Sequence, residues 1–334
     1  MRMHGFKLVV FLFLGIFILS ASGSVSLAAE TVTLKALTAW PENAFESQEF
    51  LKFVQDVQKA VDEKYPGELK IDYRGGGEVI SNKEQVEALR KGLIEMVYTA
   101  GSYYTSVVPE IDIMSLTQMK PWEERAAGVD AYLETIHNKK ANAHYLGRTG
   151  TGSTFQIFLS EPIKTVDDLK GRKLRVSPTN IPLMKDLGVV PIGMPPPEVY
   201  TAMERGVVNG YILPAGTIRD FGLVPVSKYL VFPGFYQPCQ FVLINLDAWK
   251  KVPPHLQELL TQKCEEFAKA NIKAQEEKLQ VEYAEFKKQG MTFIELSPEE
   301  SKKLLSMADK ALFTTVSAKA PEESKKLMEM ITKK

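Results

Sequence analysis

Arg175 places a guanidinium inside a segment whose other residues are typical of a buried strand. In RKLRV, residues 172–176, Leu174 and Val176 alternate with Arg175, and Pro178 follows. A planar guanidinium forms paired hydrogen bonds with a carboxylate, and burial strengthens such a pair. Two interpretations follow. Arg175 either binds the carboxylate of a bound molecule or pairs with an acidic side chain of its own chain.

Residues that support catalysis or metal binding lack the spacing that these functions need. No two of His4, His137, His144 and His255 stand at metal-ligand spacing, and His137 and His255 lie in charged helical segments that predict surface positions. A Gly-x-Ser-x-Gly elbow is absent, and GGGE at 75–78 lacks dinucleotide spacing, which favours a plain turn. We therefore predict no enzyme, no metal site and no cofactor. A secreted hydrolase is the alternative, which turnover of an ester would revive.

The first 28 residues have the three parts of a secretory signal peptide. A basic start, MRMHGFK, precedes the apolar run LVVFLFLGIFIL, and Ser26 and Ala28 then supply the small residues that a signal peptidase reads. The apolar run is short for a bilayer span, although an uncleaved anchor is the alternative. Removing Arg2 and Lys7 from 41 basic residues leaves 39 against 41 acidic residues. We expect a soluble periplasmic protein.

Length, charge and cysteine usage limit the remaining classes. A chain of 334 residues exceeds what one core usually serves, so we expect two lobes. Basic and acidic residues are equal in number, without long blocks of one sign, which argues against a nucleic-acid partner. Cys239 and Cys264 could pair in an oxidising compartment, but their surroundings favour two separate buried thiols.

The first third of the chain alternates strands and helices. Strands are predicted at 31–37, 68–73 and 94–100, and a helix at 47–64. A further helix opens at a capping box of Ser81 and Glu84 and ends at Gly92. This order predicts an α/β lobe with a mostly parallel sheet.

From about Gly150 the pattern changes to short strands with helical pieces between them. The strands fall at 153–160, 172–177, 189–194, 208–214 and 239–245. Residues 253–290 then form the longest helical pattern, which at 1.5 Å per residue would be about 50 Å long. Because one lobe is too small for such a helix, we expect it to span both.

From DDLKGRKLRV through EVYTAMERGVVNGYILP to LINLDAWKKVPPHLQELL, the chain resembles the DctP-like substrate-binding proteins of TRAP (tripartite ATP-independent periplasmic) transporters. The likeness covers nearly the whole mature chain. It implies an α/β fold of two lobes, with crossing strands as a hinge, a ligand cleft between the lobes and a long helix spanning both. The implied bounds are 30–152 plus 240–280 for lobe I and 153–239 plus 281–334 for lobe II.

The resemblance also implies a function. Members carry an organic acid to a permease made of a small and a large integral membrane subunit, and they are not enzymes. The arginine of the Lys-Gly-x-x-x-Arg run, here Arg175, pairs with the ligand carboxylate in that family. We expect a monomer without a nucleic-acid partner. A receptor that reports to a sensor kinase or chemoreceptor is the alternative, which neighbouring genes would distinguish.

Departures from the family pattern surround Arg175. Sialic-acid-binding members carry a second arginine twenty residues earlier, where this chain has Phe155. The strand that often reads Val-Asp-Gly-Gln-Glu-Asn-Pro is VNGYILP here, so apolar residues stand at 211–213. Polar groups buried there would lose hydrogen bonds to water at about 1–3 kcal/mol each. We therefore expect a monocarboxylate with an apolar or aromatic body, with C4-dicarboxylates and sugar acids as alternatives.

The predicted ligand-binding residues combine the arginine with this apolar surface. Asn180 follows the arginine strand and would orient the carboxylate. The loop MPPPEVY either sets the depth of the cleft or starts a helix, and we favour the helix start. The full predicted set is Arg175, Phe155, Trp40, Tyr103, Ser102, Tyr211, Leu213 and Asn180.

Overall fold

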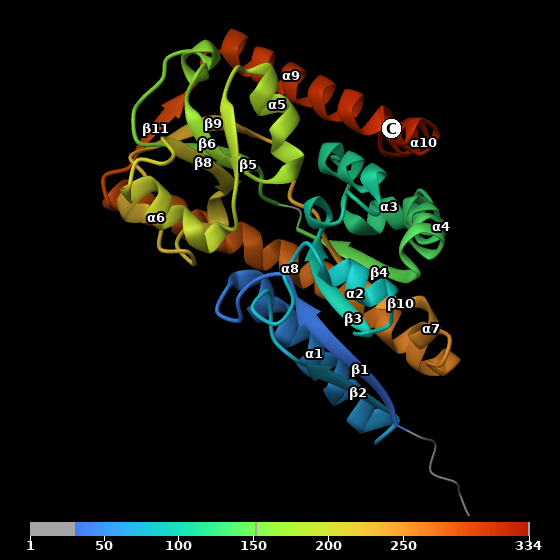
Figure 1. Cartoon of the computed structure of the whole chain (residues 1–334). Helices are drawn as coiled ribbons and strands as arrows, with labels where there is room; N and C mark the ends of the chain where they lie inside the picture. The colour runs from blue at the N-terminus through green and yellow to red at the C-terminus, as the bar shows by residue number, and fades with distance from the viewer. Residues whose placement is uncertain (1–30, 151, 333–334) are drawn as a thin grey trace, which may run out of the picture. The chain divides into compact units, whose positions relative to one another are not determined.

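The computed structural model describes residues 31–150 and 152–332, which build two β-sheets and the helices around them (Figure 1). The predicted signal peptide at 1–28 lies outside the described residues. The first sheet has the strand order β2-β1-β3-β10-β4. Its strands are β1 (Val32–Thr38), β2 (Leu69–Tyr73), β3 (Met96–Ala100), β4 (Ala143–Thr149) and β10 (Gln240–Asn245).

The second sheet has the strand order β11-β9-β5-β8-β6-β7. Its strands are β5 (Phe155–Leu159), β6 (Lys173–Val176), β7 (Val190–Gly193), β8 (Gly210–Pro214), β9 (Tyr229–Phe235) and β11 (Thr292–Glu295). Strand β6 runs parallel to β7 and β8, whereas β5 runs antiparallel to β8 and β9. Both sheets are therefore mixed, since β10 also runs antiparallel to β3 and β4 in the first.

Helices follow the strands as the alternating pattern predicted. The first, α1 (Phe45–Lys64), buries Phe50, Phe53 and Val57 against the first sheet. The shorter ones are α2 (Gln85–Arg90), α3 (Pro121–Ala126), α4 (Val129–Ala141), α5 (Ile181–Asp186), α6 (Val199–Glu204) and α7 (Leu246–Trp249). The C-terminal region adds α8 (Pro254–Lys288), α9 (Pro298–Ser317) and α10 (Pro321–Thr332).

The predicted capping box before α2 is wrong. Ser81 and Glu84 form a turn, in which the Glu84 amide donates to the Ser81 carbonyl, and α2 begins only at Gln85 without a side-chain cap. Gly92 ends this helical segment as predicted, because its φ of 71° lies in the left-handed region that glycine adopts without strain.

The prediction of one long helix is confirmed. Helix α8 starts at Pro254 and packs Leu256, Leu260 and Phe267 into the core of the first sheet. Further along, Phe286 packs with Tyr211 of the second sheet. Figure 1 shows α8 passing from one sheet to the other, so this helix connects the two cores.

Two connections also carry the chain between the sheets. Residues 150–154 link β4 to β5, and residues 236–239 link β9 to β10. Gly150 adopts a φ of 89°, and a Cβ there would stand 2.0 Å from Oε1 of Gln240, so only glycine fits. All strands fall in the lobe predicted for them. The lobe bounds stay a prediction, because α10 of predicted lobe II packs on α4 and on the 3₁₀ segment Pro109–Leu116.

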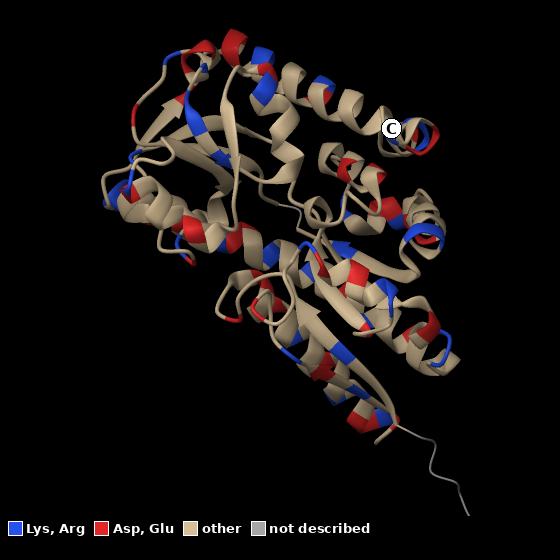
Figure 2. Ribbon diagram, in the orientation of Figure 1, with Lys and Arg blue, Asp and Glu red and all other residues tan. Residues whose placement is uncertain are grey.

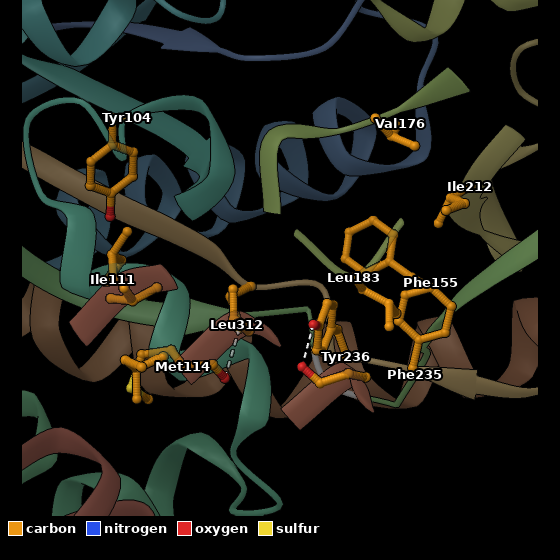
Figure 3. Close-up of a cluster of buried hydrophobic side chains, with 14 of the residues drawn as sticks. Tyr104, Ile111, Met114, Phe155, Val176, Leu183, Ile212, Phe235, Tyr236 and Leu312 are labelled. Carbon is orange, nitrogen blue, oxygen red and sulfur yellow. Dashed lines mark hydrogen bonds between the residues drawn. The ribbon is translucent and has the colours of Figure 1, made fainter. Parts of the chain in front are cut away.

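The largest hydrophobic cluster extends through both regions. Figure 3 shows it running from Tyr104 and Ile111 to Phe155 and Phe235. The hydroxyl of Tyr236, in the second connection, donates to the Ala308 carbonyl at 2.6 Å. Helix α9 is thereby fixed to the segment that joins the sheets.

His137 is buried, so its predicted surface position is wrong. It belongs to the face of α4 that packs on the core, where its Nδ1 donates to the Leu133 carbonyl and its Nε2 accepts from the Tyr104 hydroxyl. Burial lowers the pKa of His137 to about 4. The neutral ring is therefore a core residue at neutral pH.

Charged residues of both signs are interspersed along the helices (Figure 2). None of the helices among residues 31–150 and 152–332 is both long enough and apolar enough to cross a membrane.

Candidate functional site

Arg175 lies near the end of β6 with its guanidinium buried. Its side chain is 2% exposed. Nε donates to the Met194 carbonyl at 2.9 Å and Nη1 donates to the Ile212 carbonyl at 3.1 Å. No carboxylate of the described residues pairs with it. The interpretation of Arg175 as half of an internal ion pair therefore has no support in the described chain.

Burial changes the electrostatics of this arginine. It lowers the pKa of Arg175 to about 10, and the nearby Tyr103 opposes this shift only in part. The guanidinium remains charged at neutral pH. A buried charge without a counter-ion is energetically costly. An anion that reached Arg175 would remove that cost.

A cavity of about 90 Å³ opens beside Arg175 at the ends of several strands. Parallel sheets present ligand sites at the carboxyl ends of their strands, and the loops after β6 and β7 contribute here. The turn before α2 and the 3₁₀ turn after β3 close the opposite side. Its lining comprises Asn82, Lys83, Tyr103, Arg175, Val176, Ser177, Pro178, Ile181, Gly193, Met194, Pro195 and Pro196.

Tyr103 is the second predicted residue that lines this cavity. Burial raises its pKa, whereas the charge of Arg175 lowers it. Trp40 does not line the cavity but packs against Tyr103 with ring centroids 6.3 Å apart. Ser102 is half-buried beside Tyr103 and is likewise outside the lining. Pro196 lines the cavity and also begins the short 3₁₀ turn before α6, so both interpretations of MPPPEVY describe this loop.

The predicted apolar residues of the second sheet are not brought to this cavity. Tyr211 stacks on Phe158 at 4.9 Å, and its hydroxyl is hydrogen-bonded to Ser227 at 2.5 Å. Leu213 lies in the same core cluster as Tyr211. Phe155 packs on the other face of the sheet, near Ile212 in Figure 3. All three are core residues in this structure.

Asn180 lies behind the cavity and contacts one of its walls. Its Nδ2 donates to the Ser177 Oγ at 2.8 Å, and Ser177 lines the cavity. The adjacent Thr179 donates to Asp112 at 2.8 Å. Burial raises the pKa of Asp112 to about 7. Asn180 therefore positions Ser177 in the described structure.

Sequence reasoning missed Asn82, Lys83, Ser177 and Met194. Their only signal was location, because each stands in a loop directly after a strand or before a helix. Asn82 and Lys83 were assigned to the first turn of a helix that in fact begins later. The error in the capping box thus hid two cavity residues.

A second, smaller cavity of about 10 Å³ lies at the start of α1. It is lined by Phe45, Glu46, Ser153, Pro214, Gly216, Thr217, Pro238, Gln240, Gln275 and Lys278. Glu46 is 3% exposed, and its Oε2 has no hydrogen-bond partner in the part of the chain that the structure describes. Burial raises the pKa of Glu46 to about 7, although a bond from a backbone amide opposes the rise.

The lysine nearest to Glu46 has another partner. Nζ of Lys278 lies 2.8 and 2.7 Å from the two carboxylate oxygens of Asp220. Asp220 also accepts from the Phe45 amide at 3.2 Å, and Lys278 lies over the Phe45 ring. Glu46 therefore has no counter-ion of its own among the described residues.

The described part of the chain contains neither a disulfide bond nor a group of residues that could bind a metal ion. Cys239 and Cys264 are separate buried thiols, as favoured from the sequence. No group of three or more His, Cys, Asp or Glu residues within 31–150 and 152–332 is arranged to hold a metal ion.

Solved structures with the same fold are TRAP periplasmic solute-binding proteins. One from Desulfovibrio salexigens, with bound orotic acid, matches with a TM-score of 0.78 and 20% identity over 90% of this chain and 97% of that chain. DctP7 of Bordetella pertussis, a receptor binding pyroglutamic acid, matches with a TM-score of 0.79 and 18% identity over 90% and 99%. The predicted periplasmic binding protein fold is confirmed.

Curated relatives and a family model agree with this fold. A monocarboxylate 2-oxoacid-binding periplasmic protein of Nostoc is 26% identical over 71% of this chain and 66% of its own length. A solute-binding protein of Sulfitobacter is 28% identical over 72% and 78%. The model of bacterial extracellular solute-binding proteins, family 7 (DctP), matches residues 39–316. The chain belongs to this family of solute receptors.

Proposed function

We propose that this protein captures an organic acid by binding its carboxylate to Arg175. The observation that carries the proposal is a charged, buried guanidinium that faces a cavity and has no carboxylate partner in the described chain. A carboxylate would form charge-assisted hydrogen bonds with the fork of this arginine. Ser177 and Lys83 offer further donors on the same cavity.

The ligands of similar proteins support the acid class. The names of two matched structures report orotic acid and pyroglutamic acid, and another from Haemophilus influenzae contains L-gulonate. The Nostoc relative is named for monocarboxylate 2-oxoacids. Each of these molecules carries one carboxyl group.

Within this class we propose a monocarboxylate with an apolar or aromatic body. Support now comes from the cavity wall of Tyr103, Ile181, Met194 and the prolines at 195–196, since Phe155 and Leu213 pack elsewhere. Apolar ligand surface gains about 25 cal/mol per Å² on burial against such a wall. Lys83 and Asn82 in the same lining favour the second candidate, a C4-dicarboxylate or sugar acid.

We further propose that the protein works outside the cytoplasm and delivers the acid to the small and large membrane subunits of a TRAP permease. Ligand binding would favour the closed form of the receptor, which the permease then recognises. Delivery to a sensor is the alternative. Genes for membrane subunits or for a sensor kinase beside this gene would distinguish the two.

Thermal melting of the mature protein tests the proposal. The panel holds indole and phenyl acids, branched keto acids, C4-dicarboxylates and sugar acids. A ligand at a hundred times its Kd stabilises by about 2.7 kcal/mol and raises the Tm by several degrees. We expect aromatic monocarboxylates to raise the Tm of the wild type and of Lys173→Met, an exposed control on the same strand, but not of Arg175→Ala. The proposal is overturned if no acid of the panel raises the Tm, or if the acids raise the Tm of Arg175→Ala as much as that of the wild type.

A further inference from the structure

Glu46 has a buried carboxyl group to which the proposed acid site gives no role. Among residues 31–150 and 152–332, its Oε2 has no partner, and the hydroxyl of Ser153 in the same cavity also lacks one. The Ser153 side chain is 7% exposed, so solvent does not readily satisfy either group. Buried polar atoms without partners are uncommon in folded proteins and call for a specific explanation.

Glu46 and Arg175 face the same tyrosine. Tyr103 lines the Arg175 cavity and packs on Trp40. The Trp40 carbonyl accepts a hydrogen bond from Ser47, the neighbour of Glu46. Burial is the main cause that raises the pKa of the Tyr103 hydroxyl. The charge of Arg175 lowers this pKa, whereas the charge of Glu46 raises it. A buried cation and a buried carboxyl thus both act on the tyrosine of this aromatic pair.

The two cavities also meet the same strand. Ile212 of β8 supplies a carbonyl to Arg175, and Pro214, at the end of β8, lines the Glu46 cavity. A molecule lying across the end of β8 would place one end at each charge.

The size of the Glu46 cavity and its hydrogen-bond acceptors suit one small group that donates hydrogen bonds. A volume of about 10 Å³ holds a single group of the size of a water molecule. Glu46 Oε2 and Ser153 Oγ can both accept hydrogen bonds, and Thr217 Oγ1 donates to the Pro214 carbonyl, which leaves its lone pairs available. An ammonium group brings three donors, a matching number. Lys278 does not fill this role, because Asp220 binds it.

We propose that the captured acid is zwitterionic, with its carboxylate on Arg175 and its ammonium group on Glu46. This inference rests on the proposed function, since it assumes that Arg175 binds the carboxylate. The substrate is then an amino acid or another amino-substituted acid. The α1 start then selects the substrate by its cationic end, and Arg175 by its anionic end.

Matched pairs of acids test this inference by titration calorimetry. Pentanoate is compared with 2-aminopentanoate, 4-aminopentanoate and 5-aminopentanoate, and 3-phenylpropanoate with phenylalanine. A charge-assisted hydrogen bond predicts that at least one amino acid binds about tenfold or more tightly than its unsubstituted partner. This preference should be larger at pH 8 than at pH 6, because Glu46 has a pKa of about 7 and is ionised above it.

Two variants locate the effect. Glu46→Gln should abolish the preference for the amino group while leaving the affinity for the unsubstituted acid. Glu49→Gln is the matched control, since Glu49 is 5% exposed on the same helix but pairs with Lys52 at 2.5 Å. Ser153→Ala should reduce the preference severalfold, as expected for one neutral hydrogen bond. It provides a second test if Glu46→Gln fails to fold.

The outcomes separate the two proposals. Unsubstituted acids that bind equally well or better than every amino acid overturn the zwitterion. The same conclusion follows if Glu46→Gln and Ser153→Ala keep the full preference, or if a crystal structure of a complex shows only water or a metal ion beside Glu46. If Arg175→Met binds every ligand as the wild type does, or if no acid of either panel binds, the proposed function itself fails.

Discussion

Arg148 and Arg175 are both buried arginines on β-strands, with exposures of 1% and 2%, but their surroundings differ. Arg148, on β4, donates to the two carboxylate oxygens of Glu124 at 2.8 and 2.7 Å. It also donates to the Met119 carbonyl. Arg175, on β6, donates to the carbonyls of Met194 and Ile212 and to no other group of the described residues.

The electrostatic consequences are opposite. Burial is the largest single influence on the pKa of Arg148 and lowers it, but the charge and hydrogen bonds of Glu124, together with Cys239 and Tyr145, outweigh burial, and the net shift is upward. For Arg175, burial dominates and the net shift is downward, to about 10. Burial of an arginine alone therefore does not identify a ligand site. The distinguishing feature is whether the chain supplies the counter-ion.

The largest expected effect comes from removing that counter-ion. Glu124→Gln leaves Arg148 buried without a carboxylate, which should lower the free energy of unfolding by about 3–5 kcal/mol. Urea denaturation measures the loss. The double variant Glu124→Gln/Arg148→Met should recover most of it, because no unpaired charge then remains. An unchanged stability in the single variant would show that Arg148 does not depend on Glu124.

Arg175→Met tests the arginine that has no counter-ion among the described residues. The free protein should keep its stability within about 1 kcal/mol, because the substitution removes a buried charge that lacks a counter-ion. Affinity for the acid should fall about a hundredfold, as expected when one partner of a buried charge pair is removed. Parallel urea denaturation and calorimetry measure the two quantities. A large loss of stability with little loss of affinity would assign Arg175 a structural role.

Asp112, which is hydrogen-bonded to Thr179 behind the Arg175 cavity, should make stability depend on pH. Asp112 accepts from the Thr179 hydroxyl, and burial raises its pKa from 3.8 to about 7, with Lys319 opposing. Its contribution to stability is therefore complete below pH 4 and is lost as the pH rises through 7. Asp112→Asn should remove this dependence, about 3 kcal/mol between pH 5 and pH 8.

Denaturation of Asp112→Asn and the wild type across this pH range measures the difference. His137, whose pKa is lowered to about 4, acts in the other direction, and both proteins share it. Parallel pH profiles in the two proteins would contradict the assignment to Asp112.

The smallest effect is expected at the exposed edge of the Arg175 cavity. Lys83 lines the cavity but is exposed, so its interactions are screened by solvent. Lys83→Met should change the affinity for a monocarboxylate by less than about threefold. Calorimetry measures the change in affinity that Lys83→Met causes for the monocarboxylate and for a dicarboxylate of matched size. A much larger loss for the dicarboxylate would favour the C4-dicarboxylate alternative.

The sequence allowed the positions of strands and helices to be predicted better than the directions of side chains. Alternation located β6, and the unbroken helical pattern located α8. Alternation did not indicate which side of β8 faces a ligand, because Tyr211, Ile212 and Leu213 are all buried. A strand covered on both faces has no exposed side to mark the site. For this reason Tyr211 and Leu213 were predicted to bind the ligand, whereas the structure places them in the core.

The burial of titratable residues was also not indicated by the sequence, and of the two examples only His137 had been predicted, wrongly, to lie at the surface. Glu46 stands in the first turn of α1, where an acidic residue ordinarily complements the helix dipole at the surface. His137 stands among charged residues of α4 yet faces the core. In both cases burial depends on contacts distant in sequence, with Ser153 and Gln275 for Glu46 and Tyr104 for His137. Local pattern does not contain that information.

The central claim is that Arg175 is the counter-ion of the captured acid. The most direct test is calorimetric titration of the acid that gives the largest rise in Tm into the wild type, Arg175→Lys and Arg175→Met. Lysine keeps the charge but loses the planar fork, so we predict that affinity falls in the order wild type, Arg175→Lys, Arg175→Met, with the last about a hundredfold below the wild type. Binding to Arg175→Met with the affinity of the wild type would contradict the claim.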